Sequence, residues 1–191
     1  PGSATHGQRL SWDMITMYQV CTYFLLPLTQ ASLCSYAEVA ANCEQAPVWM
    51  VSHWWGTKFT WTVRMLQHHA ASRHGSEAMN AVYWICTLAN NQHDLAELEE
   101  PDILKSPFAK VLLSKACIGT IHLCDPDVTT FQRVWVVFET YLTAQLQQGA
   151  IGEKAWHYFD LACVVLGDGE SGFAAALLQD ATDGNWHDSA D

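Results

Sequence analysis

The sequence predicts an α/β domain in which helices cover both faces of a parallel sheet, and three observations lead to this fold class. Short apolar runs of strand length alternate along the chain with longer amphipathic stretches of helical length. The connections between them have the lengths usual for strand–helix units. With 191 residues, of which 50% are hydrophobic, the chain is long enough for one domain with a sizeable core.

The chain before the first predicted strand forms a helical extension. Residues 11–26 carry apolar side chains at mixed i+3 and i+4 spacing, Ser11 is placed to cap this helix, and Pro27 is expected to end it. A second short helix is predicted over 32–41. The expected divisions are an N-terminal helical extension over 1–46, the α/β domain over 47–181 and a polar tail over 182–191.

Four short apolar runs are predicted as the strands of the sheet. They cover residues 48–53, 81–89, 117–124 and 158–167. The run at 81–89 is nearly continuous in its apolar character, which is typical of a strand buried on both faces. A parallel sheet of such strands brings their carboxyl ends to one edge, where ligands usually bind.

Four stretches between and after these strands are predicted as covering helices. They span residues 58–73, 107–116, 131–148 and 173–181. On the third of these helices, the expected buried stripe is Phe131, Val134, Trp135, Phe138 and Leu142. Glu139 then lies at the border of that stripe, as the one acid in "QRVWVVFET".

The composition excludes several classes of partner. A formal net charge of −11 makes nucleic acid and anionic membrane surfaces poor partners. No apolar run approaches the roughly 20 residues that span a bilayer. The seven cysteines are odd in number and include no C-x-x-C, which indicates reduced thiols. We therefore expect a cytoplasmic protein or, alternatively, one inside an organelle such as a plastid after loss of a targeting peptide.

Metal and phosphate motifs are not indicated. His68 and His69 are adjacent on one predicted helix and point about 100° apart, with His74 nearby, so these histidines do not form a ligand set. No Cys/His spacing matches a zinc module. The glycine-rich turn "GDGESG" (167–172) carries two acids that would repel an anion.

Polar and aromatic residues follow the predicted strands where a ligand is expected. This combination suits a pocket for a polar, ring-containing small molecule. The candidate residues are Ser52, His53, Trp54 and Trp55 after the first strand, Asn90, Asn91 and Gln92 after the second, and Trp135 and Glu139 on the helix after the third.

Two segments of the chain resemble parts of TIR (Toll/interleukin-1 receptor) domains. "VWMVSHWWG" is similar to their first strand, and "PFAKVLLSKACIGTIHLCDPDVTTFQRVWVVFE" to their run of helix, third strand, turn and helix, which ends with a tryptophan four residues before a glutamate. "VSHWWG", "YWICTLANNQHDL" and "FQRVWVVFETYL" more closely resemble an uncharacterised TIR-like group of algal and other protist genomes. The resemblance covers roughly residues 47–180 and implies a flavodoxin-like sheet, with a fifth strand that the sequence does not place.

The resemblance also implies an activity. Some TIR domains cleave NAD between nicotinamide and ribose, using the glutamate that here corresponds to Glu139. A carboxylate suits this chemistry because the bond breaks through an oxocarbenium-like state and nicotinamide leaves as a neutral molecule. NAD is then a substrate, and no cofactor is expected. The ring-stacking candidates are Trp54 and Trp55, and the candidates for hydrogen bonds to ribose or phosphate are Asn90, Asn91 and Gln92. Only Lys58 and Arg133 are near enough in sequence to bind a pyrophosphate.

The same residues allow a second function, a non-enzymatic scaffold that assembles with itself or with other protein subunits. Glu139 is then a structural carboxylate, and His53 a hydrogen-bonded structural histidine. The polar residues after the second strand then satisfy loop backbone groups, and the tryptophans pack under the N-terminal helices. A cavity beside Glu139 would favour the enzyme, whereas a carboxyl group covered by packing would favour the scaffold.

Overall fold

The computed structural model describes residues 10–98, 101–152, 157–166, 173–178 and 186–188. Within them a six-stranded sheet has the order β2-β1-β3-β4-β5-β6. The strands are β1 (Trp49–His53), β2 (Tyr83–Ile85), β3 (Gly119–Cys124), β4 (Tyr158–Leu166), β5 (Phe173–Leu178) and β6 (Trp186–Asp188). β1 to β4 are parallel, while β5 and β6 are antiparallel to their neighbours.

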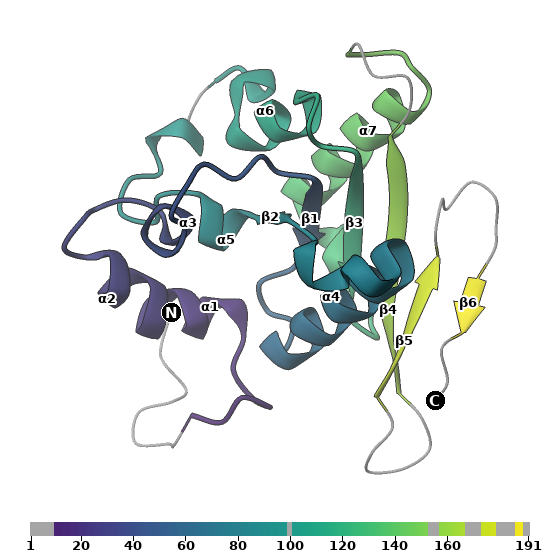
Figure 1. The fold of residues 1–191 in the computed structure, drawn as a ribbon, viewed down its shortest axis with the longest axis horizontal. Helices are drawn as coiled ribbons and strands as arrows, with labels where there is room; N and C mark the ends of the chain where they lie inside the picture. Colours follow the sequence, from purple (N-terminus) through teal and green to yellow (C-terminus); the bar gives the residue numbers. More distant parts are fainter. Residues whose placement is uncertain (1–9, 99–100, 153–156, 167–172, 179–185, 189–191) are drawn as a thin grey trace.

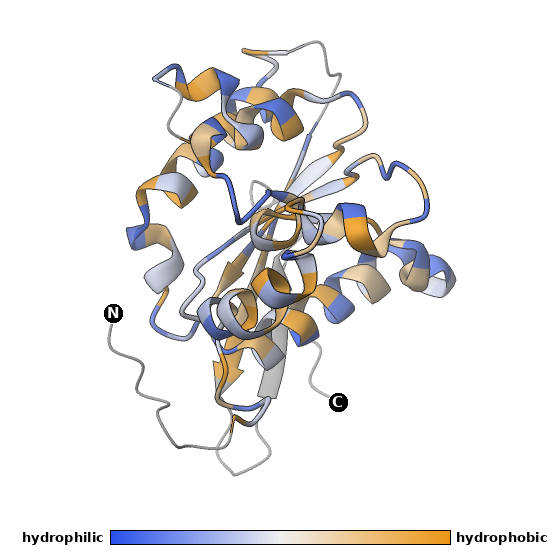
Figure 2. Ribbon diagram, turned by 90° about the vertical axis from the view of Figure 1, so that its left-hand side faces the viewer, coloured by the Kyte–Doolittle hydropathy of each residue, from blue (hydrophilic) through white to orange (hydrophobic). Residues whose placement is uncertain are grey.

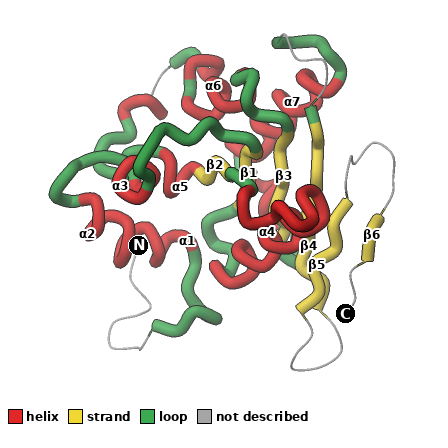
Figure 3. The backbone as a smooth tube through the Cα atoms, viewed as in Figure 1, coloured by secondary structure: helices red, strands yellow, loops and turns green. Residues whose placement is uncertain are grey.

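Helices lie on both sides of the sheet, which confirms the predicted fold class (Figures 1 and 3). The α-helices are α1 (Met17–Val20), α2 (Leu26–Thr29), α3 (Tyr36–Ala40), α4 (Phe59–His74), α5 (Cys86–Ala89), α6 (Pro107–Leu113) and α7 (Val134–Gln147). Short 3-10 helices include η2 (Gly75–Asn80), η3 (Ala96–Leu98), η4 (Ile103–Lys105) and η5 (Thr129–Gln132). None of the helices in the described ranges is long and apolar enough to cross a membrane.

The alternation of side chains along β1 divides the core into two layers. Met50 packs with residues of α6 and α7, including Leu112 and Leu142. Val51 points to the opposite face and packs with Met65 of α4. Both layers are therefore apolar, as expected for a parallel sheet covered on both sides.

A close approach between neighbouring strands requires glycine at the start of β3. Trp49 pairs with Gly119 in the register of β1 and β3, and its ring stacks on Tyr158 of β4 with centroids 5.7 Å apart. A Cβ atom on Gly119 would lie 2.3 Å from the Trp49 ring. The missing side chain thus lets one indole ring cover three strands.

Residues 173–178 form strand β5, so the predicted helix over 173–181 is wrong within the described residues. "FAAALL" has no polar side that would make a helix amphipathic, and it pairs antiparallel with β4 along its whole length. The connection from residue 166 to residue 173 is too short for a parallel crossover, which needs a dozen or more residues. β5 is the fifth strand of the observed sheet, and it runs antiparallel to β4.

The second predicted strand is shorter than expected. β2 contains only Tyr83–Ile85, and the chain then turns into α5 at Cys86. β2 lies at the edge of the sheet and its residues are half-buried, so the predicted burial on both faces is wrong. Its apolar side chains are instead covered by neighbouring helices and loops, a long-range effect that the local pattern does not show.

The N-terminal extension packs against the domain beside β1. Pro27 does not end the helix, because it lies in the first turn of α2, where its missing N–H is tolerated after the π-helical turn η1 (Cys21–Leu25). The Met17 N–H donates to the Trp55 carbonyl at 3.0 Å, and the Phe59 N–H donates to the Ile15 carbonyl at 2.8 Å. These bonds fix the extension to the loop that leaves β1.

Candidate functional site

Ser52 and Glu139 meet at the carboxyl end of β1. The Ser52 hydroxyl donates a short hydrogen bond to the Glu139 carboxyl group, joining β1 to α7. The strand order reverses between β1 and β3, and α7 follows β3, so this pair lies at the switch point where open α/β sheets bind ligands. The sequence analysis listed both residues among the candidates at this edge of the sheet.

The carboxyl group is enclosed by packing. Glu139 is only 3% exposed. Burial raises its pKa to about 8, and the hydrogen bond from Ser52 only partly offsets this effect. At neutral pH the group is therefore mainly the neutral acid, which does not stabilise a developing positive charge as a carboxylate does.

α7 is rotated relative to the predicted buried stripe. Val134 is 78% exposed, whereas Val136 and Glu139 are buried, so the predictions that Val134 is buried and that Glu139 lies at the border are wrong. The observed stripe is Val136, Glu139, Leu142, Thr143 and Leu146. Polar partners on the sheet explain the rotation, because α7 turns its hydroxyl and carboxyl groups inward to meet them.

A row of hydrogen bonds joins α7 to the sheet. Besides the bond from Ser52 to Glu139, Thr140 bonds the His122 ring at 3.0 Å. Thr143 bonds Thr120 at 2.8 Å. Each helix residue thus meets a polar residue of β1 or β3. Glu139 is one member of this structural row, which explains why a carboxyl group is tolerated in the core.

His53 points away from Glu139. Alternation along β1 places Ser52 on the α7 face and His53 on the α4 face. His53 is 7% exposed, and neither ring nitrogen has a hydrogen-bond partner among the described residues. Burial lowers its pKa to about 4, which a backbone interaction with Val51 partly offsets, so the ring is neutral.

The two tryptophans after β1 have different surroundings. Trp55 packs against the apolar cluster of the N-terminal extension, as the second interpretation predicted, and its indole N–H donates to the Cys86 sulfur at 3.3 Å. Trp54 lies against Gly56, where a Cβ atom would come within 2.2 Å of its ring.

Burial raises the pKa of Cys86 to about 11, and the nearby Glu139 carboxyl group adds to the shift.

The polar residues after β2 mostly bond the chain itself. The Asn91 amide donates to the Leu33 carbonyl at 2.8 Å. The Gln92 amide donates to the carbonyls of Cys86 and Asn90, both at 3.3 Å. These contacts fix the loop against the N-terminal extension. Trp135 stacks on Phe108 with ring centroids 4.9 Å apart.

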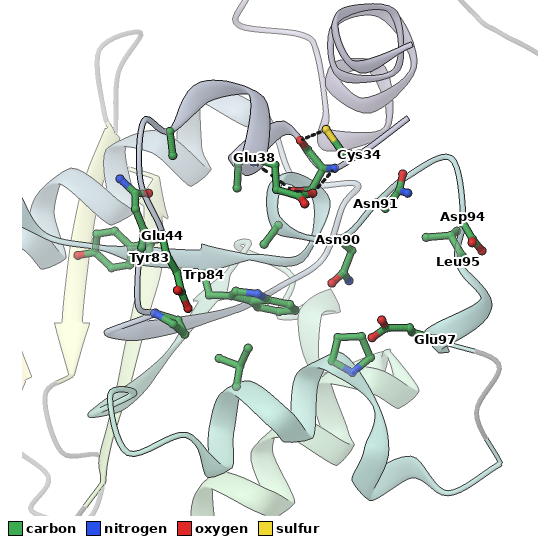
Figure 4. Close-up of a pocket in the computed structure, with 18 of the residues that line it drawn as sticks. Cys34, Glu38, Glu44, Tyr83, Trp84, Asn90, Asn91, Asp94, Leu95 and Glu97 are labelled. Carbon is green, nitrogen blue, oxygen red and sulfur yellow. Dashed lines mark hydrogen bonds between the residues drawn. The ribbon is translucent and has the colours of Figure 1, made fainter. Parts of the chain in front are cut away.

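A cavity of about 980 Å³ lies at the β2 edge of the sheet. α3 and residues 41–47 line it on one side, and β2, α5 and η3 on the other (Figure 4). Asn90 and Asn91 line this groove, but Ser52 and Glu139 are not among its described lining residues. The candidate residues that were expected to share one pocket therefore lie in two places. Ser52 and Glu139 are buried, whereas Asn90 and Asn91 line the open groove.

A buried ion cluster lies on the α4 face, where sequence patterns did not indicate one. Asp160 of β4 accepts hydrogen bonds from Arg73 at 2.6 and 2.8 Å and contacts the His69 ring at 2.9 Å. The other His69 nitrogen contacts the Tyr83 hydroxyl at 2.6 Å. An acid inside the apolar run "YFDLACVVL" was the available signal. His69 therefore has partners other than a metal, and no group of three potential metal ligands occurs in the described residues.

Comparison of the chain with family models, curated proteins and solved structures finds no match. The likeness to TIR domains thus stays a prediction from the motifs.

Proposed function

We propose that the chain is a protein-interaction module that uses its α/β fold for assembly with further copies of itself. The observation that carries this proposal is the apolar outer surface of the N-terminal extension. Trp12, Met14 and Leu28 are 59%, 71% and 60% exposed, respectively. Isolated exposed apolar residues are ordinary, but a contiguous group marks an interaction surface.

The exposed rings of the extension lie together. Trp12 stacks on Phe24 with centroids 5.9 Å apart, and it also contacts Phe59 of α4 at 5.8 Å. Figure 2 turns the left-hand side of Figure 1, where α2 and α3 lie, toward the viewer, and hydrophobic residues are visible along these helices. We call the set Trp12, Met14, Phe24 and Leu28 the apolar face.

Charge supports a second copy as the occupant of the apolar face. The chain carries a net charge of −11, so most of its surface repels another copy. Between residues 10 and 30, however, Asp13 is the one charged residue. Two extensions can therefore pack together without bringing many like charges into contact.

Sedimentation velocity over a range of protein concentrations tests this proposal. The wild-type chain is expected to associate, and the double variant Trp12→Gln, Leu28→Gln is expected to remain monomeric with an unchanged circular dichroism spectrum. Met79→Gln is the matched control, because Met79 is 95% exposed and lies outside the extension. A wild-type chain that is monomeric at every concentration would overturn the proposal.

NAD cleavage is a second candidate, which the place of Glu139 in the fold supports although its burial does not. A buried acid with a raised pKa, at the switch point of a parallel sheet, is a frequent feature of active sites. Since Glu139 is only 3% exposed, this activity would require the packing around it to open. Nicotinamide release from NAD by the concentrated protein tests it, with Glu139→Gln as the inactive variant and Glu77→Gln as an exposed control. No release by the wild-type protein would exclude this candidate for the isolated chain.

A further inference from the structure

The groove at the β2 edge has a strongly negative lining. Four carboxylate residues contribute to it: Glu38, Glu44, Asp94 and Glu97. None of the lining residues that the structure describes is Lys, Arg or His. Glu97 is paired with Lys110 at 3.1 Å, outside the lining set, so one of the four charges is partly compensated. A net negative field therefore remains in the groove.

The carboxylates are held on both walls. The Ser35 backbone N–H and hydroxyl donate to Glu38 at 2.8 and 2.7 Å, which fixes this side chain at the start of α3 and lowers its pKa. Asp94 accepts a hydrogen bond from the Ala96 N–H at 3.0 Å on the opposite wall. Figure 4 shows Glu44 on one side of Trp84 and Asp94 and Glu97 on the other.

An aromatic ring lies in the middle of this negative groove. Trp84 of β2 is half-buried, and its ring packs edge-on against Phe108 with centroids 5.4 Å apart, which holds it in position. Indole is the side chain that attracts a cation most strongly through its ring face, and guanidinium groups are its most frequent partners. A fixed ring surrounded by carboxylates is therefore suited to an organic cation.

We propose that this groove binds an arginine-bearing peptide segment of a partner protein, with one guanidinium group over Trp84 and the carboxylates of both walls around it. The volume, about 980 Å³, is at the upper limit for a single small ligand and suits several residues of an extended peptide. Asn90 points toward the groove in Figure 4, where its amide can bond a peptide backbone.

A second copy of this chain is not the occupant that we assign to the groove, because no short segment of the chain carries more than one arginine. Of its nine basic residues, Lys105, Lys110 and Lys115 are the closest in sequence, and they stand five positions apart. We therefore assign the occupant to a different protein, and the proposal goes beyond self-association through the apolar face, because it concerns another surface.

Fluorescence anisotropy with a labelled octapeptide of alternating glycine and arginine tests the proposal. The wild-type chain is expected to bind it saturably, more weakly at about 150 mM than at about 50 mM NaCl. Glu44→Lys with Asp94→Lys should weaken binding about tenfold or more. Glu77→Lys with Asp127→Lys is the matched control, because both acids are exposed, lie outside the groove and give the same net charge. Trp84→Leu, checked for folding by circular dichroism, should also weaken binding.

Three results would overturn the proposal. The first is the lack of saturable binding by the wild-type chain. The second is an equal loss in the groove and control variants, which would show attraction by net charge alone. The third is competition by agmatine as strong as that by the unlabelled peptide, which would assign the groove to small organic cations. The groove variants should still associate in sedimentation, so failure of this proposal and failure of self-association are distinguishable.

Discussion

Ser52 at the carboxyl end of β1 donates a hydrogen bond to Glu139 of α7, and the surrounding packing leaves this acid 3% exposed. The pair joins the helix to the sheet in a row with two threonine contacts from the same helix. An acid at the position where catalysis was expected thus has a structural partner inside the fold. Because the acid is buried in the folded state, its ionisation changes the free energy of unfolding. This change can be measured without a substrate.

Replacing Glu139 by Gln should remove a pH dependence of stability. The folded-state pKa is about 8 against an ordinary value of 4.5, so the folded protein binds an additional proton between these values. Stability from this group is complete below about pH 4.5 and is lost as the pH rises through 8, by a few kcal/mol in all. Urea unfolding from about pH 7 to pH 8, where buried histidines such as His53 are neutral in both the folded and the unfolded state, should show this loss in the wild-type protein and a much flatter profile in the Gln variant.

The matched control for this experiment is Glu77→Gln, since Glu77 is exposed and lies outside the core. It should reproduce the wild-type profile. A Glu139→Gln profile that falls as steeply as the wild type between pH 7 and 8 would contradict the assignment of the pH dependence to Glu139.

The rotation of α7 predicts that substitutions at two nearby valines of this helix lower the free energy of unfolding by different amounts. Val136 is 2% exposed and Val134 is 78% exposed. Val136→Ser should lower the free energy of unfolding by about 2 kcal/mol, because it buries a hydroxyl and leaves a void. Val134→Ser should change it by less than about 0.5 kcal/mol. Equal effects in urea unfolding would contradict the observed face of the helix.

Gly119→Ala should destabilise the sheet, because the new Cβ would meet the Trp49 ring at 2.3 Å and the Tyr158 Cβ at 2.8 Å. A cost of about 2 kcal/mol is expected from overpacking. In a Trp49→Leu background the same change should cost less, since the ring is gone. A double-mutant cycle measured by thermal unfolding gives this coupling, and strict additivity of the two changes would argue against the contact.

Cys163 should react faster than an ordinary thiol of similar exposure. It pairs with Cys124 in the register of β3 and β4, and the neighbouring Cys124 thiol lowers the pKa of Cys163. Site-resolved alkylation by iodoacetamide at about neutral pH should therefore slow several-fold at Cys163 in Cys124→Ala. The exposed Cys43 is the internal control and should keep its rate. An unchanged rate at Cys163 would show that the neighbouring Cys124 thiol does not activate it.

The parallel part of the fold could be predicted from local sequence patterns. The runs around β1, β3 and β4 are apolar because a strand covered on both faces meets no water, and this signal is local to each run. The helices α4, α6 and α7 could also be predicted locally, because their apolar residues recur with the period of a helix. The meeting of Ser52 with Glu139 also followed, since the carboxyl ends of parallel strands share one edge.

Local patterns did not predict which side of each element is buried or which residues pack around it, because long-range contacts set both. The rotation of α7 depends on hydroxyl and imidazole partners from strands far away in sequence, so a count of apolar residues placed Val134 in the core. Strand β5 depends on the exposed edge of β4, which offers hydrogen bonds that the short connection can reach. The separation of the Asn90 groove from the Glu139 carboxyl group likewise arises from the N-terminal extension, which packs over the loop after β1 and forms one wall of the groove. Such contacts join residues that are distant in sequence. Local patterns do not predict them, because burial and hydrogen bonding depend on how the whole chain packs.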